Sequence, residues 1–212
     1  KGGGYMMNIE FAQAYEKFNQ ALELDPDFTV ALTLVATLTN GAVKKTYSDK
    51  ALASAAGKTP GEQLFASLSK PGNSPEENRK IWADLRQQFP DGSFINFFYV
   101  LSRATPEEQF AAAQEYLAKF PDVAAIHNIL GYGYLQVKKD TVNAKKHFEK
   151  YIQLYPDGCN PYDSMGEFYF NSGDMENAEK YYKLALEKYP FNNSSIEKLG
   201  EIKKVKDKAK AH

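Results

Sequence analysis

The sequence predicts an all-α fold, a solenoid of stacked helical hairpins (an α–α superhelix) that ends in a capping helix. The first observation is a row of six prolines that lie 34, 30, 31, 35 and 34 residues apart: Pro26, Pro60, Pro90, Pro121, Pro156 and Pro190. A near-constant period of this length is typical of stacked helix–turn–helix repeats. The second observation is the pattern between the prolines, where apolar residues recur at helical spacing.

Five of the prolines follow an amphipathic run and precede a short polar step, as in the segments LDPDF, FPDG and YPDG. Proline ends a helix because it lacks an N–H and its ring clashes with the preceding turn. Pro60 differs, since it stands in KTPGEQ, where it suits the first turn of a new helix. We therefore expect five repeat ends and one helix start.

Composition narrows the classes of function. Apolar residues make up 43% of the 212 residues and charged residues 25%, which is ordinary for a folded soluble chain. The net charge of −1 gives no electrostatic reason to expect nucleic acid or an anionic membrane as a partner. The longest apolar stretches are too short to span a bilayer. We expect no nucleic-acid binding and no membrane span.

The sequence predicts no catalytic residue, no metal site and no cofactor, so we do not expect an enzyme. Cys159 is the single cysteine, which excludes an internal disulfide and argues against a thiolate metal site. The histidines, His127, His147 and His212, have no partners at the spacing of a metal or triad motif and are expected to be structural or solvated. Glycine-rich phosphate loops and the GxSxG motif are absent from the sequence.

The most regular pattern runs from Tyr162 to Pro190. It sets large, small and aromatic residues in a fixed order: Tyr162, Met165, Gly166, Tyr169, Ala178, Tyr182, Ala185 and Pro190. Gly166 and Ala178 let two helices approach closely, and the aromatic residues fill the space beside them. This order resembles the tetratricopeptide repeat (TPR), a helix–turn–helix unit of about 34 residues, with Met165 in place of the usual Leu.

Two further units share this register. The preceding unit has one extra residue in its turn and contains His127, Leu130, Gly131, Tyr134, Ala144, Phe148, Tyr151 and Pro156. The N-terminal unit lacks nearly all of its first helix and contains Gly2, Tyr5, Ala14, Phe18, Ala21 and Pro26. Between them the small residues are mostly missing, although helices are expected over 28–40, 43–57, 61–70, 76–89, 93–103 and 106–119.

The resemblance implies a right-handed TPR-type solenoid over residues 1–212. Within it we expect a partial repeat over 1–26, degenerate helical repeats over 27–121, two well-formed repeats over 122–190 and a capping helix over 191–212. The expected helix 194–211 places its apolar residues on one face: Ile196, Leu199, Ile202 and Val205. An array has to end in a polar outer surface, and this lysine-rich helix suits that role.

In TPR superhelices the first helices of the hairpins line a concave groove in which partner peptides lie, and this is what the resemblance implies here. The groove positions grade from apolar and aromatic to acidic: Phe94, Phe97, Asn128, Tyr132, Leu135, Asn160, Asp163, Glu167 and Phe170. The segment FINFFYVL is so apolar that several of its rings have to be core instead. The predicted function is a non-catalytic scaffold that binds a protein or peptide.

Alternatives stay open. The chain could be an adaptor or sensor region of a larger protein, or an enzyme that uses Asp163 and Glu167, one helical turn apart, for acid–base chemistry. A clamp for a peptide carboxylate, known in chaperone-binding TPR proteins, requires basic residues where this chain has acidic ones. By analogy with uncharacterised bacterial TPR proteins, we expect the periplasm or cell surface, with the cytoplasm as the alternative.

Overall fold

The protein is described here by a computed structural model over residues 1–210, and every secondary-structure element in that range is helical. Ala211 and His212, which ended the predicted capping helix, lie outside the described residues. The elements are, in chain order, α1 (Gly2–Met7), α2 (Phe11–Leu24), α3 (Thr29–Leu38), α4 (Gly41–Ser54), α5 (Pro60–Ala66), η1 (Ser67–Ser69), α6 (Pro75–Gln88), α7 (Ser93–Leu101), α8 (Pro106–Lys119), α9 (Ala125–Gly133), η2 (Tyr134–Lys138), α10 (Thr141–Leu154), α11 (Asn160–Asn171), α12 (Met175–Lys188) and α13 (Asn193–Lys210).

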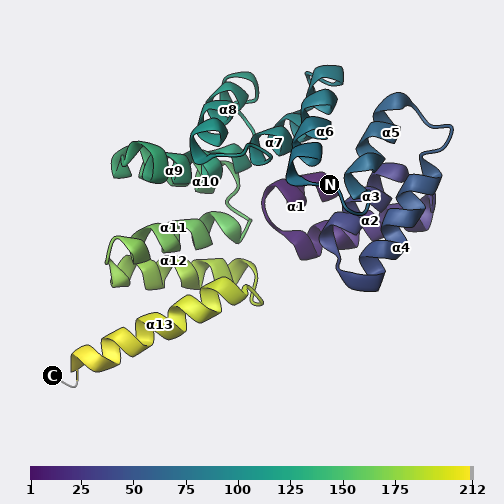
Figure 1. The fold of residues 1–212 in the computed structure, drawn as a ribbon. Helices are drawn as coiled ribbons and strands as arrows, with labels where there is room; N and C mark the ends of the chain where they lie inside the picture. The colour runs from purple at the N-terminus through teal and green to yellow at the C-terminus, as the bar shows by residue number, and fades with distance from the viewer. Residues whose placement is uncertain (211–212) are drawn as a thin grey trace. The chain divides into compact units, whose positions relative to one another are not determined.

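Contacts divide the chain into two compact units (Figure 1). Unit 1 covers Lys1–Ala112 and unit 2 begins at Ala113, so the division falls inside α8. The all-α fold predicted from the sequence is confirmed, whereas the organisation of residues 1–212 as one continuous array stays a prediction.

Helix starts follow from local capping chemistry. α5 begins at Pro60, as the KTPGEQ context predicted, and Thr59 and Glu62 form a reciprocal capping box. α6 has the same arrangement, with Ser74 at the cap position followed by Pro75. Each box satisfies two backbone N–H groups that have no partner within the helix, and proline at the first position loses nothing because its N–H would be unpaired there.

Unit 2 is built around rings that lie against glycines. A Cβ atom added at Gly166 would lie 2.8 Å from Tyr182 Cδ1, and one added at Gly131 would lie 2.6 Å from Phe148 Cε1. Tyr182 and Phe148 are 1% and 0% exposed. Each contact joins the two helices of one hairpin, α11 to α12 and α9 to α10, and α13 then packs on α12. Figure 1 shows α11, α12 and α13 lying in succession.

The extra residue in the turn of the first unit-2 hairpin is absorbed as a π-helix. The five residues Tyr134–Lys138 form this segment, and the backbone N–H of Asp140 donates to the Tyr134 carbonyl. Lys139 then reverses the chain in the left-handed region, with φ of 54°. A single π turn accommodates an inserted residue without breaking the helix, so the spacing of Gly131 and Phe148 is preserved in space although it is one residue longer in sequence.

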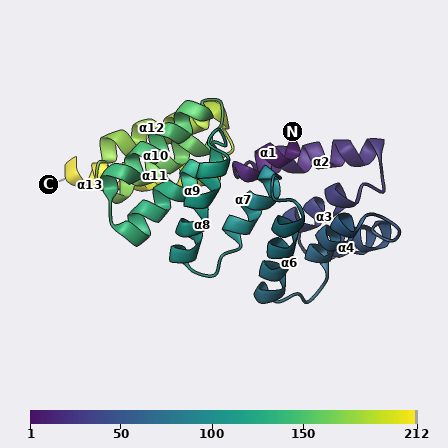
Figure 2. The same ribbon diagram turned by 90° about the horizontal axis from the view of Figure 1, so that it is seen from above.

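Unit 1 closes on itself. α1 packs against α2 and α7, and further contacts connect α2, α3, α5, α6 and α7 in turn. Figure 2 shows α3 between α2 and α4. The N-terminal glycines make the closure possible: Phe18 lies against Gly2, as in the unit-2 hairpins, and Phe94 of α7 lies against Gly3. Side chains of α1–α3 and α5–α7 share one apolar core.

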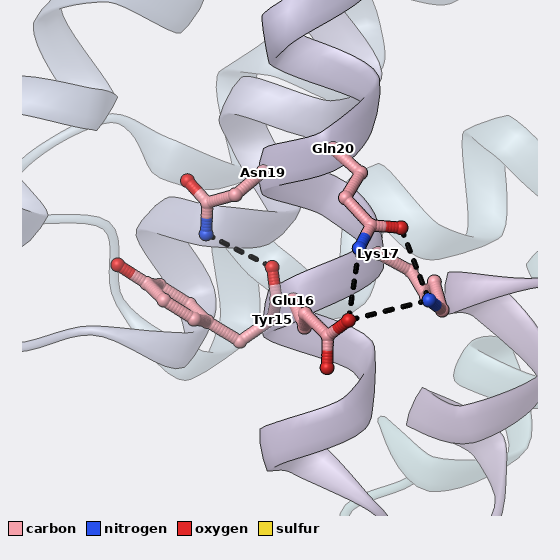
Figure 3. Close-up of polar contacts among 5 residues, drawn as sticks. All are labelled: Tyr15, Glu16, Lys17, Asn19 and Gln20. Atoms are coloured by element: carbon pink, nitrogen blue, oxygen red, sulfur yellow. Dashed lines mark hydrogen bonds and ion pairs between the residues drawn. The ribbon is translucent and has the colours of Figure 1, made fainter.

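Polar side chains of α2 contact one another along the helix, as Figure 3 shows. Lys17 donates hydrogen bonds to Glu16 and Gln20, and the Gln20 amide donates to Glu16 at 2.8 Å. The Asn19 amide donates to the Tyr15 carbonyl at 2.9 Å. Phe18 of the same helix is 8% exposed and packs in the core.

The capping helix α13 buries less than the sequence pattern predicted. Ile202 is 1% exposed and packs with Leu199 against α12 residues. Ile196 and Val205, expected on the same buried face, are 48% and 49% exposed. Only the middle of α13 lies against the preceding hairpin closely enough to cover apolar side chains.

His127 and His147 form a pair in the core of unit 2. Their Nδ1 atoms lie 2.8 Å apart, so one ring donates to the other. His127 is 5% exposed and its Nε2 has no hydrogen-bond partner. Burial, with smaller contributions from the charges of His147 and Lys150, lowers the pKa of His127 to about 4. The expectation that His127 is a packing residue agrees with this burial.

Adding a methyl group at Gly166 is expected to destabilise the protein. In Gly166→Ala the new Cβ overlaps a fully buried ring, which costs about 1–3 kcal/mol of unfolding free energy. Gly200→Ala is the matched control, because Gly200 is an exposed helical residue with nothing within 4 Å of an added Cβ, and it should gain up to about 1 kcal/mol. Urea unfolding followed by circular dichroism measures both, and equal effects would contradict the ring-on-glycine account.

Acid is expected to weaken unit 2 through His127. Above its ordinary pKa of about 6.5 the residue is neutral in both states and costs nothing. Between there and its folded pKa of about 4 the unfolded chain binds a proton that the fold excludes, so stability falls as the pH falls. The measurement is the melting temperature across this range. His127→Gln should show a smaller decrease, and an identical decrease in both proteins would rule out this role of His127.

Candidate functional site

The candidate site of unit 2 lies on the first helices of successive hairpins. α11 packs against α10 and α12, and α13 packs against both α11 and α12. Seven of the nine predicted groove residues lie on α9, its continuation η2, and α11: Asn128, Tyr132, Leu135, Asn160, Asp163, Glu167 and Phe170. The structure brings several of them into direct contact.

Tyr132 and Glu167 connect α9 to α11. The Tyr132 hydroxyl donates a hydrogen bond to Glu167 Oε2. Burial, followed by this bond, raises the pKa of Tyr132, so the phenol remains a donor at neutral pH. A hydrogen bond to an ionised carboxylate is stronger than one between neutral groups. This contact therefore fixes two groove positions against each other.

Asp163 connects α11 to α13. Its Oδ1 accepts from the Ser195 hydroxyl, and its Oδ2 accepts from the Ser194 hydroxyl at 3.2 Å. Burial raises the pKa of Asp163, while the two serine bonds act in the opposite direction. Both carboxylate oxygens are engaged in holding two helices together. Acid–base chemistry by Asp163 and Glu167 therefore stays a hypothesis, and the geometry is that of a contact between repeats.

The two groove asparagines differ. The Asn160 amide donates to the Tyr151 hydroxyl at 3.1 Å and so supports the interior of unit 2. Asn128 is 6% exposed and its Oδ1 accepts no hydrogen bond. A buried amide oxygen without a partner is costly, so Asn128 is the groove residue that would gain most from an N–H donor.

The apolar groove residues of unit 2, Leu135 and Phe170, are half-buried. Lys198 of α13 lies over the Phe170 ring, with Nζ 4.7 Å from the centroid, and also pairs with Glu201 at 3.1 Å. Leu135 and Phe170 therefore expose some apolar surface, and the Phe170 ring lies beside the charge of Lys198.

α13 adds two acidic residues that the sequence pattern had assigned only to a cap. Glu197 and Glu201 follow Asp163 and Glu167 by 34 residues, so the repeat period itself was the available signal. Burial raises the pKa of Tyr182, and the charges of Asp163, Glu167 and Glu201 raise it further. The charges of Asp163, Glu167 and Glu201 therefore all act on Tyr182, and Glu197 lies one helical turn before Glu201 on α13. We call Asp163, Glu167, Glu197 and Glu201 the acidic face.

The two remaining predicted groove residues belong to unit 1. Phe97 is 2% exposed, so its ring is part of the core and does not face solvent. This agrees with the expectation that some rings of FINFFYVL are core. Phe94 is half-buried and lines a cavity.

This cavity has a volume of about 590 Å³. It is lined almost entirely by apolar residues of α1–α3 and α5–α7 and the turns beside them: Gly3, Phe18, Phe28, Val30, Ala31, Leu34, Thr59, Gly61, Glu62, Phe65, Leu85, Phe89, Phe94 and Ile95. Apart from Phe94, the sequence pattern did not single these residues out as a site. Phe28 and Phe89 flank the punctuating prolines Pro26 and Pro90, which was the available signal.

The described residues contain no group of three or more His, Cys, Asp or Glu side chains arranged to hold a metal ion. Cys159 is buried and its Sγ accepts from the Asn192 amide at 3.7 Å. Between residues 1 and 210, no helix combines the length and hydropathy needed to cross a bilayer.

Comparisons with known proteins match the repeats directly. Tetratricopeptide repeat family models match residues 129–158 and 161–192. The TPR repeat-containing protein PA4667 of Pseudomonas aeruginosa is 26% identical over 136 residues, which cover 60% of this chain and 23% of that protein. The chain therefore spans about a quarter of the length of this curated relative.

Solved structures agree in fold. A chain of the APC/C hetero-tetramer Cut9–Hcn1 is similar with a TM-score of 0.59 and 16% identity, over 93% of this chain and 40% of that one. The PilF protein of Pseudomonas aeruginosa is similar with a TM-score of 0.51 and 18% identity, over 94% of each chain. Two matched repeats and the ring-on-glycine contacts within them lead to one conclusion: residues 129–192 of this chain form two tetratricopeptide repeats.

Proposed function

We propose that this protein is a non-catalytic scaffold that binds a protein or peptide along the acidic face of unit 2. TPR proteins are repeat scaffolds that typically serve protein–protein interaction, which supports the general class. The observation that carries the specific proposal is the run of carboxylates on α11 and α13, beside the half-buried Leu135 and Phe170. Such a surface offers acceptors and apolar area together, which suits a peptide.

The charge of this face favours a partner segment with lysine or arginine. Glu167 accepts from Tyr132 and Asp163 from two serines, so both acids are held in place. A carboxylate that is already oriented loses little entropy when a cation binds to it. α9 and α11 contain no lysine or arginine, whereas Lys198 of α13 pairs with Glu201.

The same charges argue against capture of a peptide carboxylate. A bound carboxylate would lie among Asp163 and Glu167 without a compensating cation from α9 or α11, and like charges at short range repel. This supports the expectation from sequence that the clamp known in chaperone-binding TPR proteins is not used.

An adaptor or sensor region is the second candidate. It is supported by length, since this chain corresponds to 23% of PA4667 and to 40% of the Cut9–Hcn1 chain that it resembles. In that arrangement the scaffold would present its partner to another domain. Sequencing the gene on both sides of this segment distinguishes the scaffold proposal from the adaptor proposal. Only the adaptor proposal requires a further catalytic or signalling domain.

Reversing one exposed charge of the acidic face is expected to weaken binding of basic peptides. In Glu197→Lys an attraction becomes a repulsion, and for an exposed pair this corresponds to about a threefold to tenfold rise in Kd. The assay is an array of short synthetic peptides of graded net charge, read at low and at high salt. Binding should fall with added salt, because exposed charges are screened.

Glu187→Lys is the matched control, since Glu187 is an exposed residue of α12, a second helix of its hairpin, and undergoes the same change of charge. It should bind the array as the unaltered protein does. If both variants lose the same peptides, the effect is one of net charge alone. If neither variant changes the set of bound peptides, the acidic face is not the binding surface.

A further inference from the structure

The cavity of unit 1 is open to solvent and measures about 590 Å³. That volume lies within the range of roughly 300–1,000 Å³ that is typical of ligand pockets. Two of the lining rings, Phe28 and Phe89, are 40% and 44% exposed, so an occupant would also cover apolar surface that now faces solvent.

The lining selects for bulky apolar groups. Twelve of the fourteen lining residues are apolar or glycine, and five are phenylalanine: Phe18, Phe28, Phe65, Phe89 and Phe94. Gly61 brings the backbone of α5 close to the Phe89 ring, since an added Cβ would lie 2.7 Å from Phe89 Cε2. Water gains few hydrogen bonds on such walls, so an aromatic or aliphatic side chain is the better occupant.

The only charged lining residue is an acid. Glu62 accepts hydrogen bonds from the backbone N–H of Thr59 at 3.1 Å and from its hydroxyl at 2.7 Å. These bonds lower the pKa of Glu62, so it stays ionised at neutral pH. Lys58 precedes this cap and its charge contributes least to that effect. The cavity therefore combines phenylalanine rings with a carboxylate, and both attract a cation.

This combination decides between two occupants of similar shape. A fatty acid or an anionic lipid would fill the apolar volume, but its head group would be repelled by Glu62, and no lysine or arginine is among the lining residues. A peptide segment supplies bulky side chains and, in a neighbouring residue, an ammonium or guanidinium group for Glu62. The charge of the lining thus favours the peptide.

We propose that the cavity of unit 1 is a separate binding site for a partner segment that inserts bulky apolar side chains and places a lysine or arginine beside Glu62. The site is independent of the acidic face of unit 2, since it is formed by residues 3–95 alone. It deepens the proposed scaffold function by naming a second class of contact.

Trp82 gives a direct readout of this site. It is the only tryptophan of the chain. Its ring packs edge-on against Phe65, a lining residue, with centroids 5.8 Å apart, and stacks on Phe98 at 5.3 Å. An occupant that shifts Phe65 changes the surroundings of the indole, and both rings that contact Trp82 belong to unit 1.

The experiment is a fluorescence titration of the full chain with three probes. The first is a short blocked peptide with adjacent Phe and Leu flanked by lysines, the second is the same peptide flanked by glutamates, and the third is decanoate. We expect the lysine peptide to change Trp82 emission and to bind at least about tenfold more tightly than the glutamate peptide. Decanoate should compete poorly.

Four substitutions test whether the lysine peptide binds in the cavity. Val30→Phe narrows the cavity without adding a second indole and should weaken binding of the lysine peptide by about tenfold or more, and Phe89→Ala removes a half-exposed wall with less risk to folding. Glu62→Gln should reduce the preference for lysine over glutamate flanks while keeping the cap, because Gln serves in a capping box as Glu does. Phe191→Ala, which removes a 76% exposed ring outside the cavity, should bind normally.

Several results would overturn the proposal. They are tighter binding of decanoate or of the glutamate peptide, no change of Trp82 emission with any probe, or unaltered lysine-peptide binding in both Val30→Phe and Phe89→Ala. Fluorescence polarisation of a labelled lysine peptide measures its binding to either unit. It therefore tests the scaffold proposal separately from the cavity proposal. If the peptide binds without changing Trp82 emission, and Glu197→Lys abolishes this binding, the peptide binds at the acidic face.

Discussion

The contact on which the structure depends is an aromatic ring laid against a glycine of the neighbouring helix. Phe18 on Gly2, Phe148 on Gly131 and Tyr182 on Gly166 are one contact repeated in three hairpins. A side chain at the glycine would overlap the ring, and a smaller ring residue would leave a void, so the pair sets the distance between the helices. The first helix is thereby held in place, and its groove positions carry Asn128, Tyr132, Asp163 and Glu167.

In the middle of unit 1, where the two helices of a hairpin do not make this contact, aromatic rings pack against glycines of other helices. In the middle of the chain, Phe89 lies on Gly61 from the end of its helix, and Phe94 of α7 lies on Gly3 of α1. The helices of unit 1 therefore form a closed circuit of contacts in place of a simple succession of hairpins. The cavity lined by five phenylalanines lies among these helices.

Most of the fold can be predicted from the sequence, but less of the site can. Helix positions follow from proline spacing and periodicity because those act within one segment, and even the start of α5 at Pro60 is a local effect. The burial of Phe97 and the exposure of Ile196 and Val205 depend on which helices meet, which a single segment does not encode. The closure of α1 on α7, and with it the cavity, is a contact across about ninety residues and carries no local signal.

The two candidate surfaces differ in how far their charge can change without altering the fold. Asp163 and Glu167 hold α13 and α9 through their hydrogen bonds, so replacing either leaves buried hydroxyl groups without acceptors. Glu62 also has a structural bond, but glutamine replaces it there without loss of the cap. Removing the charge of Asp163 or Glu167 therefore also disturbs the packing of neighbouring helices. The charge of Glu62, by contrast, can be removed without destabilising unit 1.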